Sequence, residues 1–501
     1  MGSMSQARVC VRMELSKTRQ QVTVYALIAV FAGLIWILHL AAGMTYPIPW
    51  FDEGCYLFPA YSFAKFNTFL GPLFGPKIDT ILMPPFHTAL MGVLFKISGF
   101  SLAAARHASG IFMIASFVLT ALALKNYFPK YAVIVLCGLF YTNRFFIITG
   151  NNARMESLVL LAAAAGFYCL QKNRDIKGLA CLALIPVIHP AGSPIFLAGV
   201  FYYLLKPALG LARQPVRTLS ASDKIFAAAA VLVWFATWLY LVNHVSAVRS
   251  GLLDVQVARK LGRNVFAALF HRQYFTALMF MGFTALVIAV HDRRSFLLLL
   301  FAAGAWSIYK IGQELWYDIY EAYAQLLFSV LVLHAGRLLI ERSQMFARTL
   351  MKNSAVCVLV FFTVFWNFQQ TMIVNPLAGR VYWNWYGMHF QDGTRYLDTE
   401  DVRVAEGIIK KLENERTGEI VVRFYPGGDA LLFSHIVQGR VRIEYPFIAD
   451  FDRVDLSVFH FSKYNPWNND QFEALKALNV GPGKVVAREK NATEKWLYVL
   501  G

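Results

Sequence analysis

The sequence predicts a polytopic α-helical membrane protein with a C-terminal α/β domain. Of its 501 residues 57% are hydrophobic and only 15% are charged, and the mean hydropathy is +0.48. This composition is too apolar for an ordinary soluble globular protein. Apolar runs long enough to cross a bilayer continue to residue 374, and polar residues and turn motifs increase after it. We therefore expect a transmembrane domain at 1–374 and a second domain at 375–501.

The apolar runs predict about eleven spans, because a helix needs about 20 mostly apolar residues to cross the hydrocarbon core and fewer when it is broken or covered. The expected spans are 22–44, 105–124, 131–149, 154–170, 178–189, 193–206, 225–242, 275–290, 295–311, 319–340 and 354–374. The fifth and sixth are short and are interrupted by HPAGSP. No small-residue cleavage pattern follows the first run, so we expect it to be a retained anchor.

Short basic tracts predict the orientation. If residues 1–21 are cytoplasmic, the same side receives KNYFPK, QKNRDIK, KPALGLARQPVRTLSASDK, HDRR and 337–352, as the positive-inside rule requires. Much of the net charge of +17 lies in such tracts, so we do not expect a nucleic-acid partner. The loop 46–104, which follows the first span, is then on the periplasmic or extracytoplasmic side of the plasma (inner) membrane. An odd number of spans places the segment 375–501 on the same side.

The C-terminal segment has the pattern of a small α/β domain. VRVAEGIIKKLENE (402–415) predicts a helix, EIVVRFY predicts a strand after it, and YPGGDA and VGPGK predict turns. The segment contains no nucleophile elbow, Walker loop or zinc-ligand spacing. The six cysteines of the chain are scattered and predict neither a disulfide framework nor a zinc site.

Two adjacent acids, Asp52 and Glu53, follow the first span in YPIPWFDEGCYL. They are either solvated acids paired with Lys65 or Lys77, or a catalytic group at the membrane surface. In a partly apolar setting, a carboxylate can take a proton from an acceptor hydroxyl as a bond to an activated carbon forms. The neighbouring sequence decides between the two.

The motifs around these acids resemble a known class of enzymes. WFDEGCYL, the pair Pro84-Pro85, FKISG and AAARHASG together are similar to the GT-C class of membrane glycosyltransferases, in the bacterial branch related to protein O-mannosyltransferases and lipid A aminoarabinose transferases. The likeness covers 22–340 in layout and 50–160 in motifs. The aminoarabinose branch has a lysine before the proline pair, where this chain has Met83, and Lys77 or His87 is the candidate replacement.

The resemblance implies an inverting glycosyltransferase that moves a sugar from a polyprenyl-phosphate donor to an extracytoplasmic acceptor, which is lipid A, another glycolipid, a polysaccharide or a protein. Asp52 is then the expected general base. Glu53 and Glu156 are expected to position the acceptor or a divalent cation, with Asp52 and Glu156 as candidate ligands of Mg²⁺, Mn²⁺ or Ca²⁺. The C-terminal domain is expected to cover the catalytic face or to recognise the acceptor.

Positive charge over the donor phosphate is expected from Arg154, in GNNARMESL, and from Lys310. Arg154 and Glu156 also fit a simple pair at a helix start. Lys310 adjoins an aromatic cluster at 316–323, which a membrane-interface belt explains without any function.

Three further side chains are candidate phosphate ligands with plainer alternatives. His189, at the break IPVIHPAGSP, also fits a local structural hydrogen bonder. Arg259 and Arg263 belong to an amphipathic segment at 243–274 that is equally suited to attachment to the membrane surface.

A transporter or flippase of lipid-linked glycans is the alternative function, because broken helices also mark transport sites. It predicts charged groups near the middle of the bilayer and two repeating halves. A scaffold that binds cell-wall polymer is a third option, but it leaves the acidic pair and the proline pair unexplained.

Overall fold

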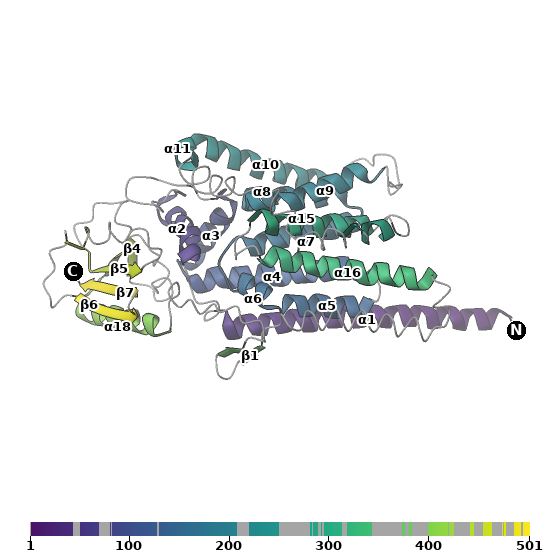
Figure 1. Cartoon of the computed structure of the whole chain (residues 1–501), viewed down its shortest axis with the longest axis horizontal. Coiled ribbons are helices and arrows are strands. Elements are labelled where there is room, and N and C mark those ends of the chain that lie inside the picture. The colour runs from purple at the N-terminus through teal and green to yellow at the C-terminus, as the bar shows by residue number, and fades with distance from the viewer. Residues whose placement is uncertain are drawn as a thin grey trace.

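The computed structural model describes the greater part of the chain. The described residues are 2–43, 51–69, 81, 83–127, 130–207, 220–249, 281–282, 284–288, 292, 295–312, 318–342, 373–375, 380–382, 399–418, 420–424, 441–444, 454–462, 473, 475–476, 485–491 and 494–500. Figure 1 shows two parts: a bundle of helices along the long axis, and a small sheet with one helix beyond one end of the bundle.

The helices of the bundle lie side by side with their axes near the long direction of the molecule (Figure 1). The helices that run along the bundle are α1 (Gly2–Ala42), α4 (Leu102–Leu124), α7 (Glu156–Gln171), α8 (Asp175–Ile188), α9 (Ser193–Leu205), α10 (Ala221–Asn243), α15 (Phe296–Gly312) and α16 (Asp318–Arg342). The other described elements of this part are α2 (Phe51–Phe66), α3 (Phe86–Ser98), α5 (Lys130–Tyr141), α6 (Arg144–Gly150), η1 (Pro190–Gly192) and α11 (Val245–Val248).

Four stretches of the described helices are long and apolar enough to cross a membrane: Thr18–Ala41, Leu102–Leu124, Ala221–Asn243 and Ile319–Leu338. The third of these, in α10, leaves Leu232, Phe235 and Trp238 more than 60% exposed, as expected of side chains that face lipid. The chain is therefore a multi-pass membrane protein.

The described helices follow the predicted spans with one correction. The run 131–149 was expected to form one span, but α5 ends at Tyr141 and α6 begins at Arg144. The helix breaks because the side-chain oxygen of Asn143 accepts a hydrogen bond of 3.0 Å from the backbone N–H of Phe145 and caps α6. The predicted span 354–374 falls almost wholly outside the described residues, as do most of 275–290 and the part of 243–274 after Arg249.

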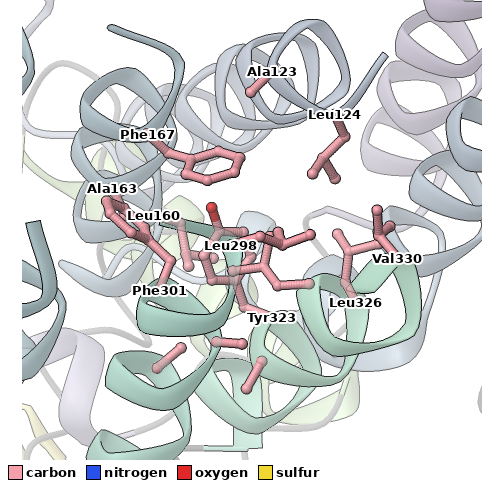
Figure 2. Close-up of a cluster of buried hydrophobic side chains, with 14 of the residues drawn as sticks. Ala123, Leu124, Leu160, Ala163, Phe167, Leu298, Phe301, Tyr323, Leu326 and Val330 are labelled. Carbon is pink, nitrogen blue, oxygen red and sulfur yellow. The ribbon is translucent and has the colours of Figure 1, made fainter. Parts of the chain in front are cut away.

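The core of the bundle lies where α7, α15 and α16 meet the C-terminal end of α4 (Figure 2). Ala163 and Phe167 of α7 face Phe301 of α15, and the Phe167 and Phe301 ring centroids are 5.0 Å apart. Helices in a membrane associate through close packing more than through the hydrophobic effect, because lipid is as apolar as the side chains. Small residues meet this need: a Cβ at Gly166 of α7 would lie 2.4 Å from Leu182 of α8.

The bundle end at which α1 begins carries basic side chains. Lys206 forms an ion pair of 2.8 Å with Asp175, and Lys125 donates a hydrogen bond of 3.0 Å to the hydroxyl of Tyr25. These lysines belong to the tracts that predict a cytoplasmic location. The other end of the bundle, where α2 and α3 lie, is the end next to the small sheet (Figure 1).

The described residues from 399 onward form one helix and a mixed five-stranded sheet. The predicted helix and strand are present as α18 (Thr399–Glu415) and β3 (Ile420–Phe424). The strand order is β4 (Val441–Glu444), β3, β5 (Leu456–Ser462), β7 (Glu494–Leu500), β6 (Val485–Asn491). β3 is parallel to β4 and β5, and the remaining pairs are antiparallel. A separate antiparallel pair, β1 (Ile373–Asn375) and β2 (Arg380–Tyr382), follows the bundle.

Candidate functional site

A set of buried charged side chains lies at the bundle end next to the sheet. The charged members come from the first two turns of α2, α4 and α7 and from the loop 151–155 between α6 and α7, and α3 adds a buried histidine. Charged groups so close to membrane-spanning helices are costly unless they are paired or have a function. Their partners therefore indicate which of them hold the structure together and which are available for a ligand.

Glu53 and Arg106 form a fully buried ion pair. Arg106 donates from Nε to Oε1 of Glu53 at 3.0 Å and from Nη2 to Oε2 at 2.6 Å, and neither side chain is exposed. Arg106 Nη1 also donates to the backbone oxygen of Gly43 at 2.9 Å. Glu53 Oε1 accepts a further bond of 2.7 Å from the backbone N–H of Ala153. The pair thus connects the end of α1, the start of α2, helix α4 and the loop before α7.

These contacts occupy both oxygens of Glu53. A buried carboxylate is tolerated because the two-point contact with a guanidinium and the extra N–H donor replace its hydration. Glu53 therefore positions the segment that carries Asp52, and its own oxygens are already committed to protein partners.

Arg154 and Glu156 form a second buried pair. Nη2 of Arg154 lies 2.7 Å from Oε1 of Glu156, and the side chains are 8% and 5% exposed. The guanidinium carbon of Arg154 lies 5.3 Å from the centroid of the Tyr56 ring, a cation–π distance. The other oxygen of Glu156, Oε2, is buried and has no hydrogen-bond partner among the described residues. Glu156 is the first residue of α7, where the helix dipole stabilises a negative charge.

His87 lies close to the same arginine. It is in the first turn of α3, in the loop between the first two spans, and its side chain is buried. Burial, and to a smaller extent the positive charge of Arg154, lowers the pKa of His87 to about 4. The ring is therefore neutral at physiological pH, and its buried Nε2 lacks a hydrogen-bond partner in the described part of the chain. Pro85 directly precedes α3, so the proline pair places His87 at this end of the bundle.

The pairs differ in what they offer a ligand. Glu53 and Arg106 satisfy each other, whereas Oε2 of Glu156 and Nε2 of His87 are buried polar atoms without described partners. Native structures rarely leave such atoms unpaired, and a bound group is one way in which they become satisfied. Arg154 pairs with Glu156 and is close enough to His87 to lower its pKa, and its positive charge suits an anionic ligand that also carries hydroxyl groups.

For five other predicted site residues, the side chain or the whole residue lies outside the described part of the structure. Asp52 lies in the first turn of α2, directly before Glu53, and Lys310 in the last turn of α15, but both side chains are outside the described part of the structure. Lys77, Arg259 and Arg263 also fall outside it.

His189 occupies the predicted break between α8 and α9. It is extended, its N–H donates to the Ile185 oxygen at 2.8 Å, and its side chain is buried. Its backbone carbonyl accepts a bond of 2.9 Å from the N–H of Gly192, so the residue shapes this corner through its backbone.

Sequence reasoning missed four residues of this end of the bundle. Arg106 and His107 are part of the motif AAARHASG, but neither was assigned a role. His39 lies within an apolar span, and Asn151 belongs to GNNARMESL but was not assigned a role. Their signal in the sequence is a polar residue where the apolar pattern predicts none.

Within the described residues no group of three or more His, Cys, Asp or Glu side chains is arranged to hold a metal ion. Glu156 Oε2 fits as one oxygen ligand, but Arg154 lies against the same carboxylate and opposes a second cation. Mg²⁺ and Ca²⁺ take six or more oxygen ligands, so the described side chains alone do not fit such an ion.

This chain is similar to known proteins in its fold and not in its sequence. No model of a protein family matches the sequence, and no curated protein sequence is significantly similar to it. The crystal structure of ArnT from Cupriavidus metallidurans bound to undecaprenyl phosphate superposes with a TM-score of 0.51 at 13% identity, over 96% of this chain and 98% of that one. The apo structure of the same ArnT gives a TM-score of 0.52 at 12% identity and the same coverage.

An oligosaccharyltransferase from Archaeoglobus fulgidus tethered with an acceptor peptide gives a lower TM-score of 0.38 at 12% identity, over 87% of this chain and 69% of that one. The match to ArnT covers nearly the full length of both chains. The fold is therefore the one that the motifs predict, that of the GT-C glycosyltransferases.

Proposed function

We propose that this chain is a membrane glycosyltransferase that moves a sugar from a polyprenyl-phosphate donor to an acceptor on the extracytoplasmic side. The observation that carries the proposal is the buried Arg154–Glu156 pair beside His87, within the fold of an enzyme whose crystal structure holds undecaprenyl phosphate. The acceptor is a glycolipid, a polysaccharide or a protein, and the reaction belongs to the transferases.

The sidedness of the site follows from charge. The site lies at the bundle end opposite the N-terminus (Figure 1). Lys125, directly after α4, and Lys206, directly after α9, lie at the other end. The positive-inside rule assigns the basic end to the cytoplasm. The site and the C-terminal sheet are then extracytoplasmic, in a plasma membrane or inner membrane.

The donor headgroup suits the side chains of the site. A phosphodiester that links a sugar to a polyprenol carries one negative charge and no proton to donate, so its oxygens need donors. Arg154 supplies a charged donor and the neutral ring of His87 supplies an uncharged one. Oε2 of Glu156 would repel a phosphate oxygen, but it can accept a hydrogen bond from a sugar hydroxyl. The site thus matches the sugar and the phosphate together.

The chemistry needs one displacement. The acceptor hydroxyl attacks the anomeric carbon and forms the new glycosidic bond, while the bond from that carbon to the phosphate oxygen breaks and its electron pair leaves with the lipid phosphate. Asp52 takes the proton of the acceptor hydroxyl. Arg154 stabilises the charge that develops on the departing phosphate. Glu53 and Arg106 fix the first turn of α2 and thereby the backbone of Asp52.

Asp52 and Glu156 would be the protein ligands of a divalent cation at this site. Such an ion would supply additional positive charge for the leaving phosphate. The steps above use only protein side chains.

The position of the charges favours a transferase over a transporter. The described ion pairs that arginine and lysine form in the bundle lie near helix ends, with Glu53–Arg106 and Arg154–Glu156 at one end of the bundle and Lys206–Asp175 at the other. A transporter is expected to bind its substrate near the middle of the bilayer, at a break between repeated halves.

The proposal is tested by comparing the cell envelope with and without this protein by mass spectrometry. We expect one glycoconjugate to lack a sugar mass when the protein is absent, which identifies donor sugar and acceptor together. The purified protein in proteoliposomes should then restore that mass when it is given the corresponding polyprenyl-phosphate sugar. An unchanged envelope, together with no transfer in proteoliposomes, would contradict the proposal.

A further inference from the structure

The loop that carries Arg154 is held from two sides. On one side, Glu53 accepts a hydrogen bond of 2.7 Å from the N–H of Ala153. On the other side, Asn151 Oδ1 lies 2.7 Å from Nδ1 of His39, and Nε2 of His39 lies 2.9 Å from Nδ1 of His107. The loop is therefore connected to α2 on one side, and through His39 and His107 to α1 and α4 on the other.

The chemistry of the partners fixes the direction of these hydrogen bonds. An amide oxygen can only accept, so the proton of a neutral His39 ring lies on Nδ1 and points to Asn151. Nε2 of His39 then accepts, and Nδ1 of His107 is the donor to it. His107 thereby selects the tautomer of His39 that can bind the loop.

The surroundings hold the His39 ring in place. The Trp36 ring stacks on it with a centroid distance of 5.2 Å and an interplanar angle of 22°. Gly110 of α4 makes room on another side, because a Cβ at that position would lie 2.7 Å from Cε1 of His39. His39 is 4% exposed, so its two ring nitrogens have protein partners in place of water. Such a ring has one orientation.

We propose that His39 and His107 are positioning residues for the site: they order the loop 151–153 and thereby hold Arg154 and Glu156 against the donor headgroup. The effect on turnover rests on the proposed function, whereas the ordering of the loop does not. Neither histidine contacts the reacting atoms in this proposal.

The two nitrogens of each imidazole can be tested separately by amide side chains. Asn places an N–H donor near the position of Nδ1, and Gln places one near the position of Nε2. His39→Asn should keep the bond to Asn151, and His39→Gln should lose it. His107→Asn should keep the donor to His39, and His107→Gln should lose it. His39→Phe fills the space without either bond.

The measurement is amide hydrogen exchange of the full-length protein in detergent, followed over peptides that contain 151–156 and, as a reference, over α10. Loss of one hydrogen bond should speed exchange in 151–156 about three- to tenfold in His39→Phe and His39→Gln. His39→Asn and His107→Asn should stay near wild type, and exchange in α10 should not change. Rescue by Asn but not by Gln separates positioning from a general loss of packing.

Two outcomes would overturn the inference: exchange in 151–156 that is unchanged in His39→Phe, or equal acceleration in the Asn and Gln variants. Binding of undecaprenyl phosphate forms a second arm, with weaker binding expected in His39→Gln than in His39→Asn. If the wild type neither binds this lipid nor transfers a sugar, the proposed function fails, while the exchange arm still decides the role of the two histidines.

Discussion

Arg106 and Glu53 are 53 positions apart in the sequence, yet their side chains meet through two contacts of 3.0 and 2.6 Å with no exposure to solvent. A buried pair of this kind is a weak source of stability when intact, because desolvation offsets the attraction. It is costly to break, because the remaining charge is left without a partner. The pair therefore disfavours any arrangement of α2 and α4 that separates the two side chains.

Arg106→Met should destabilise the protein by about 3–5 kcal/mol, since Glu53 would remain buried and charged without its cation. Thermal unfolding in detergent measures the loss. In the double variant Arg106→Met with Glu53→Gln, the amide oxygen still accepts from Ala153 and no charge is buried, so part of the stability should return. Lys96→Gln is the control, because Lys96 is exposed and donates its hydrogen bond to the exposed side chain of Asn67. A double variant as unstable as Arg106→Met alone would contradict this account.

Asp52→Asn should reduce turnover by about 10²- to 10⁴-fold, because an amide cannot take the proton of the acceptor hydroxyl. The affinity for undecaprenyl phosphate should stay within a few-fold of wild type. Initial rates in proteoliposomes and lipid binding by native mass spectrometry provide the two readings. Asp175→Asn, at the opposite end of the bundle, is the matched control and should keep its activity. A variant that loses binding as well as turnover would make Asp52 a binding residue.

The sequence predicts the helices of the bundle well because hydropathy is a local property of each span. The break at Asn143 was missed because a single capping side chain, which a hydropathy average hides, decides it. The acid at position 53 was expected at the site, but its partner Arg106 lies far along the chain, and such contacts depend on how α2 and α4 pack. His39 was missed for a related reason: it lies within an apolar run, and its partners Asn151 and His107 are brought to it only by the fold.

His87 should make the protein less stable in mild acid. Its pKa is about 4 in the folded protein against an ordinary value of 6.5, so below pH 6.5 the unfolded chain binds a proton that the folded chain does not. The stability that the neutral ring provides is complete above pH 6.5 and decreases as pH falls towards about 4, by an amount on the order of 3 kcal/mol.

The variant His87→Gln cannot take up a proton at this position in either the folded or the unfolded state, so wild type is compared with it. The difference in unfolding midpoint between wild type and His87→Gln should shift in favour of the variant as pH is lowered from 7.5 to 4.5. Groups that titrate equally in both proteins cancel in this difference. A difference that stays constant over this range would show that His87 titrates normally in the folded protein.

Arg154→Gln should weaken the binding of undecaprenyl phosphate about 10- to 100-fold, because a hydrogen bond from a charged donor to the phosphate is lost. Arg154→Lys keeps the charge but not the planar donor group, so its affinity should lie between wild type and Arg154→Gln. Lys206→Gln removes a positive charge from the opposite end of the bundle and should bind normally. Equal affinity in Arg154→Gln and wild type would remove Arg154 from the phosphate site.

The product should have the opposite anomeric configuration to the donor. A single displacement brings the acceptor hydroxyl to the face of the anomeric carbon opposite the leaving phosphate, and one such step inverts the centre. A retained configuration requires either two displacements with a glycosyl-enzyme intermediate or a front-face attack. NMR of the purified product, compared with NMR of the donor itself, distinguishes the outcomes through the one-bond coupling at the anomeric carbon. Retention would exclude Asp52 as a base in a single displacement and would require a different role for it.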